Sequence, residues 1–469
     1  MDTIESDLIR ELREALGADA VRSSSEDIVR MMKDESWLSP VLQRELERRN
    51  SKEGAARGVQ AVVRPMSEDG VRSLAAIAVR HRIALTPRGS GTSNFGLLAP
   101  EEGGLIVDFR GLAGEPDVSD GAVRAPAGTF QGTMEKAARA KGQELPVLTT
   151  TYGEATIGGW LCGGHAGLGS GVHGAVWDGI VAAVRVVTLE AEPRILSIEG
   201  AAALPLLHTF GAVGLIVETT MRAGDIHDWV EAVGFFPTFA AASSFVTELS
   251  VDTHYSHRAA TAQEEPLMPG LRALQPIRQP GAGVLLILDR AQLAEFHKLA
   301  AAHGGSLVEW QAWKPDSRGG KPSVAQMVFG HRMLWVKRLF PDAAFCHLYF
   351  DPDDPDATVR LLKERFGDEL LCELKFFRSP WMMRALGFNP ERLLPAALCV
   401  VPNGAVPGKV DEVLAFCDKS GIKYQNSHTN VIEDNGLFPD VAPIVKLKSE
   451  LDPHNLLSRG RLRSALVRP

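Results

Sequence analysis

The sequence has few of the features that mark metal-thiolate, disulfide-rich or nucleic-acid-binding proteins. Its five cysteines are odd in number and widely spaced, and none of them forms a Cys-x-x-Cys pair. This usage is typical of a reduced intracellular protein without a cysteine metal site. The 50 basic residues are outnumbered by 58 acidic ones, the net charge is −8, and no cluster of five or more basic residues occurs. The charge pattern therefore argues against nucleic acid as a partner.

Long hydrophobic runs are also missing. No apolar stretch approaches the length that spans a membrane, and residues 1–17 are predicted to form a charged amphipathic helix instead of a signal peptide. We therefore expect a cytoplasmic protein with no integral membrane segment. The hydrophobic fraction of 45% and the charged fraction of 23% are ordinary for a globular protein, and 469 residues exceed a single ordinary core. Two or three domains are expected.

The two standard nucleotide-binding motifs are absent as well. The chain has no GxxxxGK[ST] loop, and after Gly89 and Gly91 it has Asn94 where a dinucleotide fingerprint requires glycine. Residues 85–94 read LTPRGSGTSN and begin at the end of a short apolar run that we interpret as a strand. Their glycines, serines and threonines expose backbone N–H groups and hydroxyls, the arrangement that wraps a phosphate. This loop predicts a phosphate-bearing ligand.

Glycine is densest in residues 149–178, a segment that contains no lysine or arginine. The segment also holds large apolar residues such as Trp160, Leu161 and Trp177, which a polar linker would not carry. Glycine is needed where a Cβ would collide with a close neighbour or where φ is positive. Two interpretations stay open: a wall of backbone against a large flat ligand, and a set of buried tight turns in a glycine-rich core.

The predicted helices and strands do not follow strict strand–helix–strand alternation. We predict helices within residues 1–50, after Ser67 and over 129–141, and strands over 59–63, 105–109, 122–126, 181–189, 194–198 and 215–221. The strand pattern stops near residues 223–228, and a second mixed unit follows with strands over 284–288 and 346–350. This order favours an α+β protein over a doubly wound sheet.

Three motifs occur in a fixed order: PRGSGTS at residues 87–93, TIGG at residues 156–159 and GAVGLIVE at residues 211–218. Together they resemble the FAD-binding domain of the vanillyl-alcohol oxidase family, which is also named for p-cresol methylhydroxylase. Within this family the sequence is most similar to the glycolate oxidase/D-lactate dehydrogenase-like branch. The resemblance runs from residue 59 to residue 222, is thin over the middle of the chain and returns at residues 451–460.

The resemblance implies a two-subdomain FAD-binding domain roofed by an α+β cap domain. On this basis we predict four parts: an N-terminal helical arm over 1–50, an FAD-binding PCMH-type domain over 51–226, a cap or substrate domain over 227–435 and a C-terminal segment over 436–469 that returns to the FAD-binding domain. One departure concerns the family's closing Asn-Pro-Gly-Lys. Here it is Ser458-Arg459-Gly460-Arg461, so that only the glycine and a basic end remain.

The resemblance also implies which residues contact FAD. They lie on both glycine-rich segments and on one strand: Pro87, Arg88, Gly89, Ser90, Gly91, Thr92, Ser93, Thr151, Gly153, Thr156, Gly158, Gly159, Cys162, Ala166 and Ile216. The loop from Arg88 to Ser93 would supply the N–H donors that a pyrophosphate requires. Two of these residues have an alternative role, since Arg88 could form a structural ion pair and Cys162 could be a small buried thiol.

The flavin is expected to be bound without a covalent link. Some family members tether it through a histidine in an Arg-x-Gly-Gly-His loop, and the matching position here is Thr92. A tethering cysteine is missing from the matching residues 150–153. His165 and His173 lie in the glycine-rich segment, but neither matches a known tether. The resemblance therefore implies non-covalent FAD.

No metal ion is expected. The resembled branch often has cap-domain motifs of the form His-Gly-x-Gly and Gly-Asp-Gly-Asn-x-His, and neither is present. Residues 342–347 keep one histidine, His254 and His257 form a loose pair in a polar loop, and no HExxH helix exists. The missing metal motifs weaken the transfer of a 2-hydroxyacid substrate from that branch.

A flavin dehydrogenase needs a group that takes the substrate's hydroxyl proton as hydride leaves for flavin N5. Histidine suits this role because its ordinary pKa is near 6.5. We predict His428, in a polar segment near the end of the cap domain, as the first candidate. His347 is the second, on one strand face with Tyr349. His331 and Arg332 are the third, with Arg332 as a possible holder of a substrate carboxylate. For each histidine, a hydrogen-bonded structural role is the commoner alternative.

The sequence thus predicts an FAD-linked oxidoreductase, an oxidase or dehydrogenase that acts on the CH–OH group of a small alcohol or hydroxyacid by hydride transfer to FAD. The expected partners are a small-molecule substrate and an electron acceptor, which would be oxygen, a quinone or a protein. Two alternatives stay open. One is an NADPH-dependent reductase of the same fold, as in the UDP-N-acetylmuramate reductase branch. The other is a non-catalytic flavin-binding subunit of a larger complex.

Overall fold

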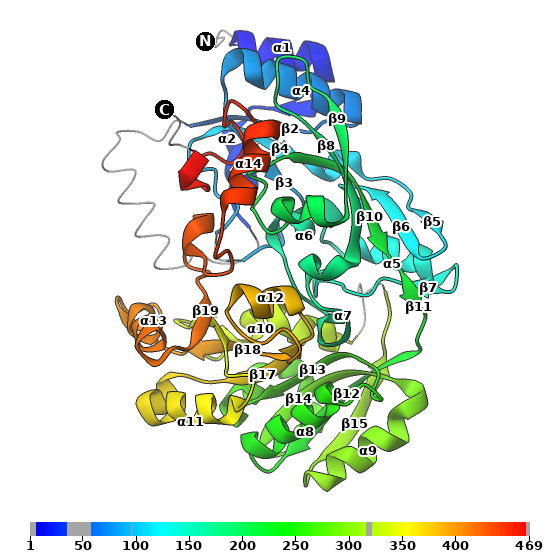
Figure 1. Ribbon diagram of the computed structural model, residues 1–469, viewed down its shortest axis with the longest axis vertical. Coiled ribbons are helices and arrows are strands. Elements are labelled where there is room, and N and C mark those ends of the chain that lie inside the picture. The colour runs from blue at the N-terminus through cyan, green and yellow to red at the C-terminus, as the bar shows by residue number, and fades with distance from the viewer. Residues whose placement is uncertain (1–5, 35–57, 95, 316–320, 466–469) are drawn as a thin grey trace.

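The computed structural model describes residues 6–34, 58–94, 96–315 and 321–465, and only the backbone over 331–334. A four-stranded sheet, a five-stranded sheet and a short two-stranded pairing of β7 (Gln143–Glu144) with β11 (Gly224–Asp225) lie in the N-terminal half of the chain, and one large sheet is built from the C-terminal half (Figure 1). The predicted α+β class is confirmed. None of the helices within the described ranges combines the length and apolar character that a membrane span requires.

The first sheet has four strands in the order β1-β2-β4-β3. β2 and β3 run parallel to β4, whereas β1 is antiparallel to β2. Helix α4 begins at its N-cap Ser67, whose hydroxyl accepts a hydrogen bond from the N–H of Gly70. The elements of this part are α1 (Asp7–Leu16), β1 (Val21–Arg22), α2 (Ser25–Met31), β2 (Val59–Val63), α4 (Glu68–His81), β3 (Leu85–Arg88) and β4 (Gly104–Asp108).

The second sheet has five antiparallel strands in the order β5-β6-β10-β8-β9. The glycine-rich segment lies beside it and forms two short helices, which the sequence did not predict. The elements are β5 (Asp117–Ser119), β6 (Ala122–Pro126), α5 (Gln131–Arg139), β7 (Gln143–Glu144), α6 (Ile157–Gly163), α7 (Ser170–His173), β8 (Val181–Val187), β9 (Ile195–Glu199), β10 (Leu215–Arg222) and β11 (Gly224–Asp225).

The third sheet, which we call the cap sheet, has eight strands in the order β15-β12-β14-β13-β17-β18-β16-β19. Its strands are β12 (Trp229–Phe236), β13 (His257–Gln263), β14 (Ala282–Asp289), β15 (Ser306–Ala312), β16 (Ala344–Tyr349), β17 (Glu373–Phe377), β18 (Leu394–Val401) and β19 (Lys423–Gln425). Its helices are α8 (Phe239–Val251), α9 (Leu293–Ala302), α10 (Phe329–Val336), α11 (Pro355–Phe366), α12 (Pro380–Ala385) and α13 (Lys409–Ser420). The change of sheet falls between β11 and β12, and the predicted domain boundaries stay predictions.

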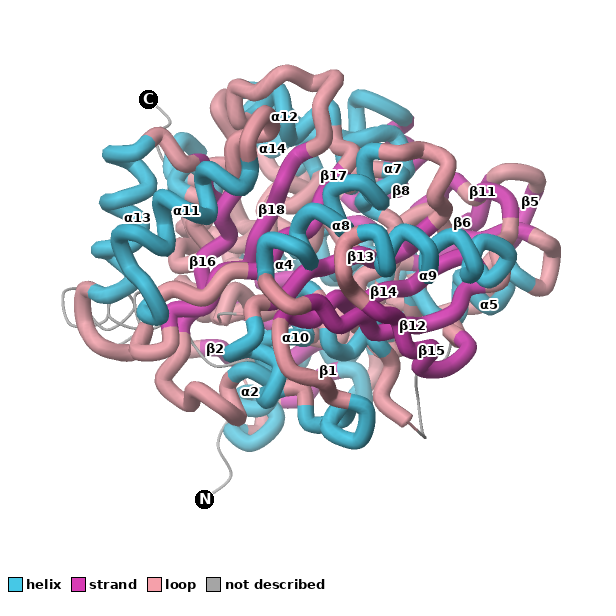
Figure 2. The backbone as a smooth tube through the Cα atoms, turned by 90° about the horizontal axis from the view of Figure 1, so that it is seen from below, coloured by secondary structure: helices cyan, strands magenta, loops and turns pink. Residues whose placement is uncertain are grey.

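The two faces of the cap sheet have different neighbours. Helices α8, α9, α11 and α13 cover the outer face (Figure 2) and share one hydrophobic core with it. On the inner face, strand residues such as Val233, Tyr349 and Phe377 belong to the core that also contains the glycine-rich segment. Successive residues of a strand point to opposite faces, so every second residue of β16, β17 and β18 faces the N-terminal half.

The C-terminal segment returns to the first sheet. After α14 (Ala442–Leu451), Leu457 forms a parallel bridge with Leu85 of β3. The N–H of Leu85 donates to the carbonyl of Leu456 at 2.8 Å, and the N–H of Ser458 donates to the carbonyl of Leu85 at 2.8 Å. One expectation about the N-terminus was wrong. Residues 1–50 do not contain helices alone, because the two residues of β1 pair with β2; residues 35–50 lie outside the described ranges.

Candidate functional site

A cavity of about 240 Å³ lies between the N-terminal half and the inner face of the cap sheet. On this measure a single water molecule needs only about 10–15 Å³, so the cavity has room for a ligand of many atoms. From the first half of the chain its lining comes from residues between 86 and 98, from residues between 149 and 166, and from His208 and Phe210. The cap sheet supplies most of the remainder. Both glycine-rich segments of the sequence therefore meet at one site.

The loop after β3 forms one end of this cavity. A Cβ on Gly89 would collide with Thr156, and Gly91 has a positive φ of 83° with the guanidinium of Arg88 directly beside it. Within the described part of the chain, the N–H groups of residues 89–93 donate to no protein acceptor, and the buried hydroxyl of Ser90 has no partner. A buried polar group without a partner is costly. The loop therefore fits a ligand with several acceptor oxygens.

Arg88 supports this loop from behind and does not line the cavity. Its side chain is 8% exposed and donates to the carbonyl of Lys33 at 2.9 Å and to the carbonyl of Ser90 at 3.2 Å. A guanidinium held by backbone carbonyls fixes the path of the loop. These two hydrogen bonds fit a structural role for Arg88, and its contact with FAD stays a prediction.

The other residues predicted to contact FAD divide into two groups. Those that line the cavity are Pro87, Gly89, Ser90, Gly91, Thr92, Ser93, Thr151, Thr156, Gly159, Cys162 and Ala166. Gly153, Gly158 and Ile216 do not line it. Gly158 is needed for packing, since a Cβ there would come within 2.8 Å of the Cβ of Ala127. Burial raises the pKa of the Cys162 thiol to about 12, so this thiol stays protonated and unreactive at neutral pH.

Three strands of the cap sheet present polar side chains to the cavity. His347 and Tyr349 come from β16, Lys375 from β17 and Gln425 from β19. The phenol of Tyr349 is 2% exposed, and its hydroxyl has no hydrogen-bond partner among the described residues. The ammonium of Lys375 contacts the carboxylate of Glu373, which lies two residues earlier on the same strand face. The cap side of the site is thus polar and largely screened from solvent.

Three imidazoles at this end of the cavity are neutral at pH 7. Burial, and next the ammonium of Lys375, lowers the pKa of His347 to about 3. Burial lowers the pKa of His208 to about 4. Burial and the neighbouring His208 lower the pKa of His165 well below its usual value, and the two rings meet edge to face with centroids 4.9 Å apart. Neutral imidazoles can accept a hydrogen bond or a proton.

The first sequence candidate for the catalytic base lies elsewhere. His428 is 4% exposed, does not line the cavity, and donates from Nε2 to the carbonyl of Phe345 at 2.9 Å. The structure therefore places His347 at the cavity and His428 behind its wall. Arg332 lies in α10, but its side chain, like that of His331, is outside the described residues.

Two cationic residues of the lining were not singled out from the sequence. One is Lys375, for which no sequence motif gave a signal. The other is Arg461, which is 2% exposed and donates from Nη2 to the carbonyl of Ala99 at 3.0 Å. Its Nη1 is buried and has no hydrogen-bond partner among the described residues, and burial lowers its pKa. The basic end of the C-terminal motif was the available signal for Arg461.

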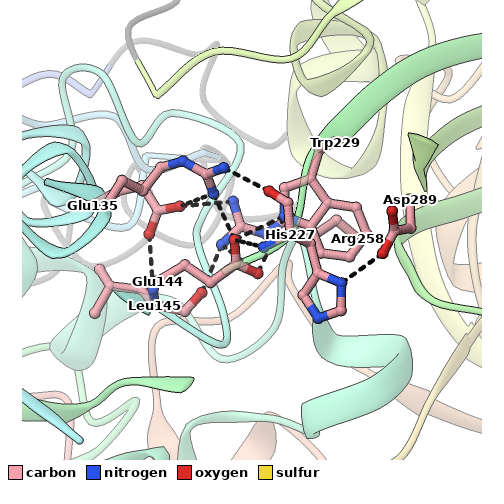
Figure 3. A network of polar contacts seen from close by, with 8 residues as sticks. Glu135, Glu144, Leu145, His227, Trp229, Arg258 and Asp289 are labelled. Atoms are coloured by element: carbon pink, nitrogen blue, oxygen red, sulfur yellow. Dashed lines mark hydrogen bonds and ion pairs between the residues drawn. The ribbon is translucent and has the colours of Figure 1, made fainter. Parts of the chain in front are cut away.

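A buried polar network joins the two halves of the chain beside the site (Figure 3). Arg258 of β13 reaches Glu135 of α5, and the indole N–H of Trp229 donates to Glu144 of β7 at 2.9 Å. Arg258 also donates to the carbonyl of Leu145 at 2.7 Å. These contacts fix β12 and β13 of the cap sheet relative to α5 and β7. Among the described residues, no group of three or more histidine, cysteine, aspartate and glutamate side chains could hold a metal ion.

Comparisons with known proteins indicate which cofactor this protein binds. Residues 59–197 match the family model described as "FAD binding domain". Over 123 residues the chain is 28% identical to the glycolate oxidase subunit GlcD of Bacillus subtilis (strain 168). This alignment covers 26% of each of the two chains. Over 199 residues it is 27% identical to the alkyldihydroxyacetonephosphate synthase of Dictyostelium discoideum, which covers 40% of this chain and 32% of the relative. The alignments thus span about a quarter to a third of these relatives.

Solved structures extend the likeness to the whole fold. Two structures of alkyldihydroxyacetonephosphate synthase, in P212121 and P1, have TM-scores of 0.70 and 0.67, each at 14% sequence identity. They match 98% and 97% of this chain, which corresponds to 85% and 86% of the synthase chains. The chain has an FAD-binding domain of the vanillyl-alcohol oxidase type. Its cofactor is FAD. In this flavoprotein the two glycine-rich segments predicted to contact FAD and the polar face of the cap sheet line one cavity.

Proposed function

We propose that this flavoprotein oxidises the CH–OH group of a small alcohol or hydroxyacid by hydride transfer to FAD. One observation carries the proposal. The cavity is lined by the loops of the FAD-binding domain and also by His347, Tyr349 and Lys375 of the cap sheet. A concave site with a few convergent polar groups, one of them a neutral imidazole, is what the orientation and deprotonation of a hydroxyl require.

The residues that would hold FAD follow from the unpartnered groups. The N–H groups of residues 89–93 and the hydroxyl of Ser90 would bind the pyrophosphate. The glycine-rich residues 159–166 would lie along the isoalloxazine ring, where small side chains permit close approach. When bound, FAD supplies the hydride acceptor at N5 of this ring.

We propose that the flavin is held without a covalent bond. The hydroxyl of Thr92, where some family members have a tethering histidine, accepts a hydrogen bond from Thr151 at 3.3 Å. Hydroxyls in this position can orient the cofactor but do not form a stable link to it. Acid precipitation should therefore release the flavin into the supernatant. A yellow pellet after washing would contradict this part of the proposal.

His347 would act as the proton acceptor. Its imidazole faces the cavity and is neutral at pH 7, so it can accept a hydrogen bond from a substrate hydroxyl. Tyr349 lies two residues away on the same face of β16, and its unpartnered hydroxyl can hold a second oxygen of the substrate. We place His347 before His428 because the latter uses Nε2 to bind the carbonyl of Phe345 inside the cap.

The function is tested by anaerobic bleaching of the visible flavin band of the purified holoprotein. A panel of hydroxyacids, sugars, lactones and aromatic alcohols should contain a class that reduces the flavin. Bleaching by NADPH alone would instead favour a reductase of the same fold. Bleaching by dithionite but by none of the organic compounds would favour a non-catalytic subunit. A colourless protein that rejects added FAD would contradict the use of this cavity for the cofactor.

A further inference from the structure

The inner face of the cap sheet carries a buried ion pair with its positive end toward the cavity. Lys375 lines the cavity, whereas its partner Glu373 does not. Glu373 is fully buried and accepts hydrogen bonds from the N–H of Leu398 at 2.8 Å and from Nε2 of Gln263 at 3.0 Å. These bonds fix the carboxylate behind the ammonium. A fixed dipole of this kind, in a poorly hydrated site, favours negative charge in front of it.

Tyr349, a hydrogen-bond donor, stands across Ala396 from Lys375 on the inner face of the cap sheet. In the register of the sheet, Ala396 of β18 is paired with Tyr349 of β16 on one side and with Lys375 of β17 on the other. Paired residues share a face, so the three side chains stand in a row with the small one in the middle. The outer two strands are about 10 Å apart, which is twice the strand spacing. Ala396 lines the cavity and leaves room between the two longer side chains.

The hydroxyl of Tyr349 provides a separate sign of a ligand. It is buried and has no partner among the described residues, which is unusual for a phenol in a folded protein. Burial also raises the pKa of this hydroxyl, so it keeps its proton and can donate it to an acceptor. A ligand oxygen above Ala396 could accept a hydrogen bond from this hydroxyl and at the same time face the ammonium of Lys375.

We propose that Lys375 and Tyr349 bind a carboxylate of the substrate above Ala396 and so select a hydroxyl compound that carries one carboxylate. The proposal rests on the proposed function and narrows it. One cation and one neutral donor match a monoanion. A phosphate dianion would bring a second negative charge for which the described lining of this face has no cation. The other cationic side chain of the described lining, Arg461, lies over the ring of Phe210.

The carboxylate would also act on His347. The ammonium of Lys375 is the second cause, after burial, of the low pKa of His347. A bound carboxylate offsets this charge and makes the imidazole a stronger base. The same compound without its carboxylate would bind less tightly and would also meet a weaker base.

The first test compares matched acids and amides as probes of the oxidised holoprotein. Acetate and benzoate, and their neutral counterparts acetamide and benzamide, are titrated while the flavin absorption spectrum is followed, with inorganic phosphate as a third arm. At least one acid should perturb the flavin and bind at least tenfold more tightly than its amide. Equal binding of acid and amide, no binding of either acid, or tighter binding of phosphate would each overturn the proposal.

The second test uses variants that should change the affinity for the acid in opposite directions. Lys375→Gln should weaken binding of the acid by about tenfold to a hundredfold, the ratio that follows loss of a charge-assisted hydrogen bond. Glu373→Gln leaves the ammonium without its carboxylate and should strengthen binding. Tyr349→Phe should weaken it several-fold. A matched control is Lys363→Gln. Lys363 of α11 forms an ion pair with Glu264 at 2.9 Å, and neither residue lines the cavity. This variant should not change the affinity for the acid.

A merely structural ion pair would give a different result, with Lys375→Gln and Glu373→Gln shifting affinity in the same direction. If Lys375→Gln does not fold, the double variant Glu373→Gln/Lys375→Gln removes both charges and should show the same loss. Loss of flavin from a folded Lys375 variant would assign this residue to the cofactor and overturn the proposal. The proposed function fails separately if the acids bind to the wild-type protein but no compound of the panel reduces its flavin.

Discussion

Arg258 of β13 and Glu135 of α5 form an ion pair that is almost completely buried. Arg258 Nη1 lies 3.0 Å from Glu135 Oε1, and the two side chains are 2% and 0% exposed. Glu135 also accepts a hydrogen bond from the N–H of Leu145 at 2.7 Å (Figure 3). Arg139 continues the network to Glu144 at 2.5 Å. The guanidinium of Arg258 lies over the ring of Trp313 as well. The N-terminal half of the chain and the cap sheet are thus joined by a charge pair that is almost completely buried.

This pair leads to a prediction about stability. Arg258→Met removes the nearer of the two cations of the buried Glu135 and leaves only Arg139 at 3.5 Å, which should lower the free energy of unfolding by about 3–5 kcal/mol. Urea denaturation of the holoprotein measures the change. The control is Arg290→Met, because Arg290 and Asp228 form a pair at 2.9 Å whose side chains are 39% and 70% exposed. An exposed pair contributes at most about 1 kcal/mol. Equal losses in the two variants would contradict a special role of the buried network.

The sequence predicted much of the fold because local patterns determine strands and caps. β2 was predicted with its observed bounds, and α4 begins at the serine that its N-cap pattern indicated. The glycine-rich segment was harder. Its helices α6 and α7 are short and contain several glycines, so helix propensity gave no signal for them. Their conformation depends on close packing, as between Gly158 and Ala127, which only the folded chain brings together.

The phosphate loop leads to a prediction about cofactor content. Gly91→Asp should abolish FAD binding, because its Cβ would collide with the guanidinium of Arg88 that fixes the path of the loop and would displace the N–H groups of the loop. Gly121→Asp is the control, since Gly121 has a similar positive φ of 70° but no atom near its missing Cβ. Flavin per folded protein, from absorbance and circular dichroism, checks the result. A Gly91 variant that keeps wild-type flavin content would show that this loop does not hold the cofactor.

The candidate site was only partly predictable, since tertiary contacts decide which polar residues face a cavity. The loop from Gly89 to Ser93 was found from its composition, and it lines the cavity. His428 was ranked first because its neighbours in sequence are polar, yet the structure turns it toward the carbonyl of Phe345. Lys375 lies between Leu374 and Phe376 of β17, and these apolar neighbours gave no functional signal. Its position depends on the register of β17 with β18, which a single sequence does not define.

Buried histidines lead to a prediction about pH. Burial lowers the pKa of His257 to about 4, and its Nδ1 donates to the carbonyl of Tyr255 at 3.3 Å. The unfolded chain therefore takes up a proton near its ordinary pKa while the folded chain does not. Stability should fall as the pH drops from about 6.5 to about 4, by up to about 1.4 kcal/mol per pH unit for each such proton. His257→Asn should make this fall shallower in urea denaturation of the apoprotein.

The control for this measurement is His254, whose pKa is shifted in the opposite direction to that of His257. The carboxylate of Glu295, 2.5 Å from the exposed ring of His254, raises the pKa of that histidine. Its contribution to stability is present below the unfolded pKa and is lost as the pH rises. His254→Asn should therefore change the stability profile only above about pH 6.5 and leave the slope of the fall between about pH 6.5 and about pH 4 unchanged. Parallel pH profiles for the wild type and the His257 variant would show that this burial has no effect on stability.

The two histidine candidates can be separated by reaction rate and stability. His347→Asn should lower the rate of substrate-driven flavin reduction by about 10²–10⁴-fold, the usual contribution of a general base. Flavin content should stay unchanged, because asparagine keeps a hydrogen-bonding group at the cavity. His428→Asn should act the other way: it disturbs a buried hydrogen bond to Phe345, so the melting temperature should fall while the reduction rate per bound flavin stays near normal. Stopped-flow bleaching and thermal melts of both variants measure the two effects. A slow His428 variant with wild-type melting, beside a normal His347 variant, would return the catalytic role to His428.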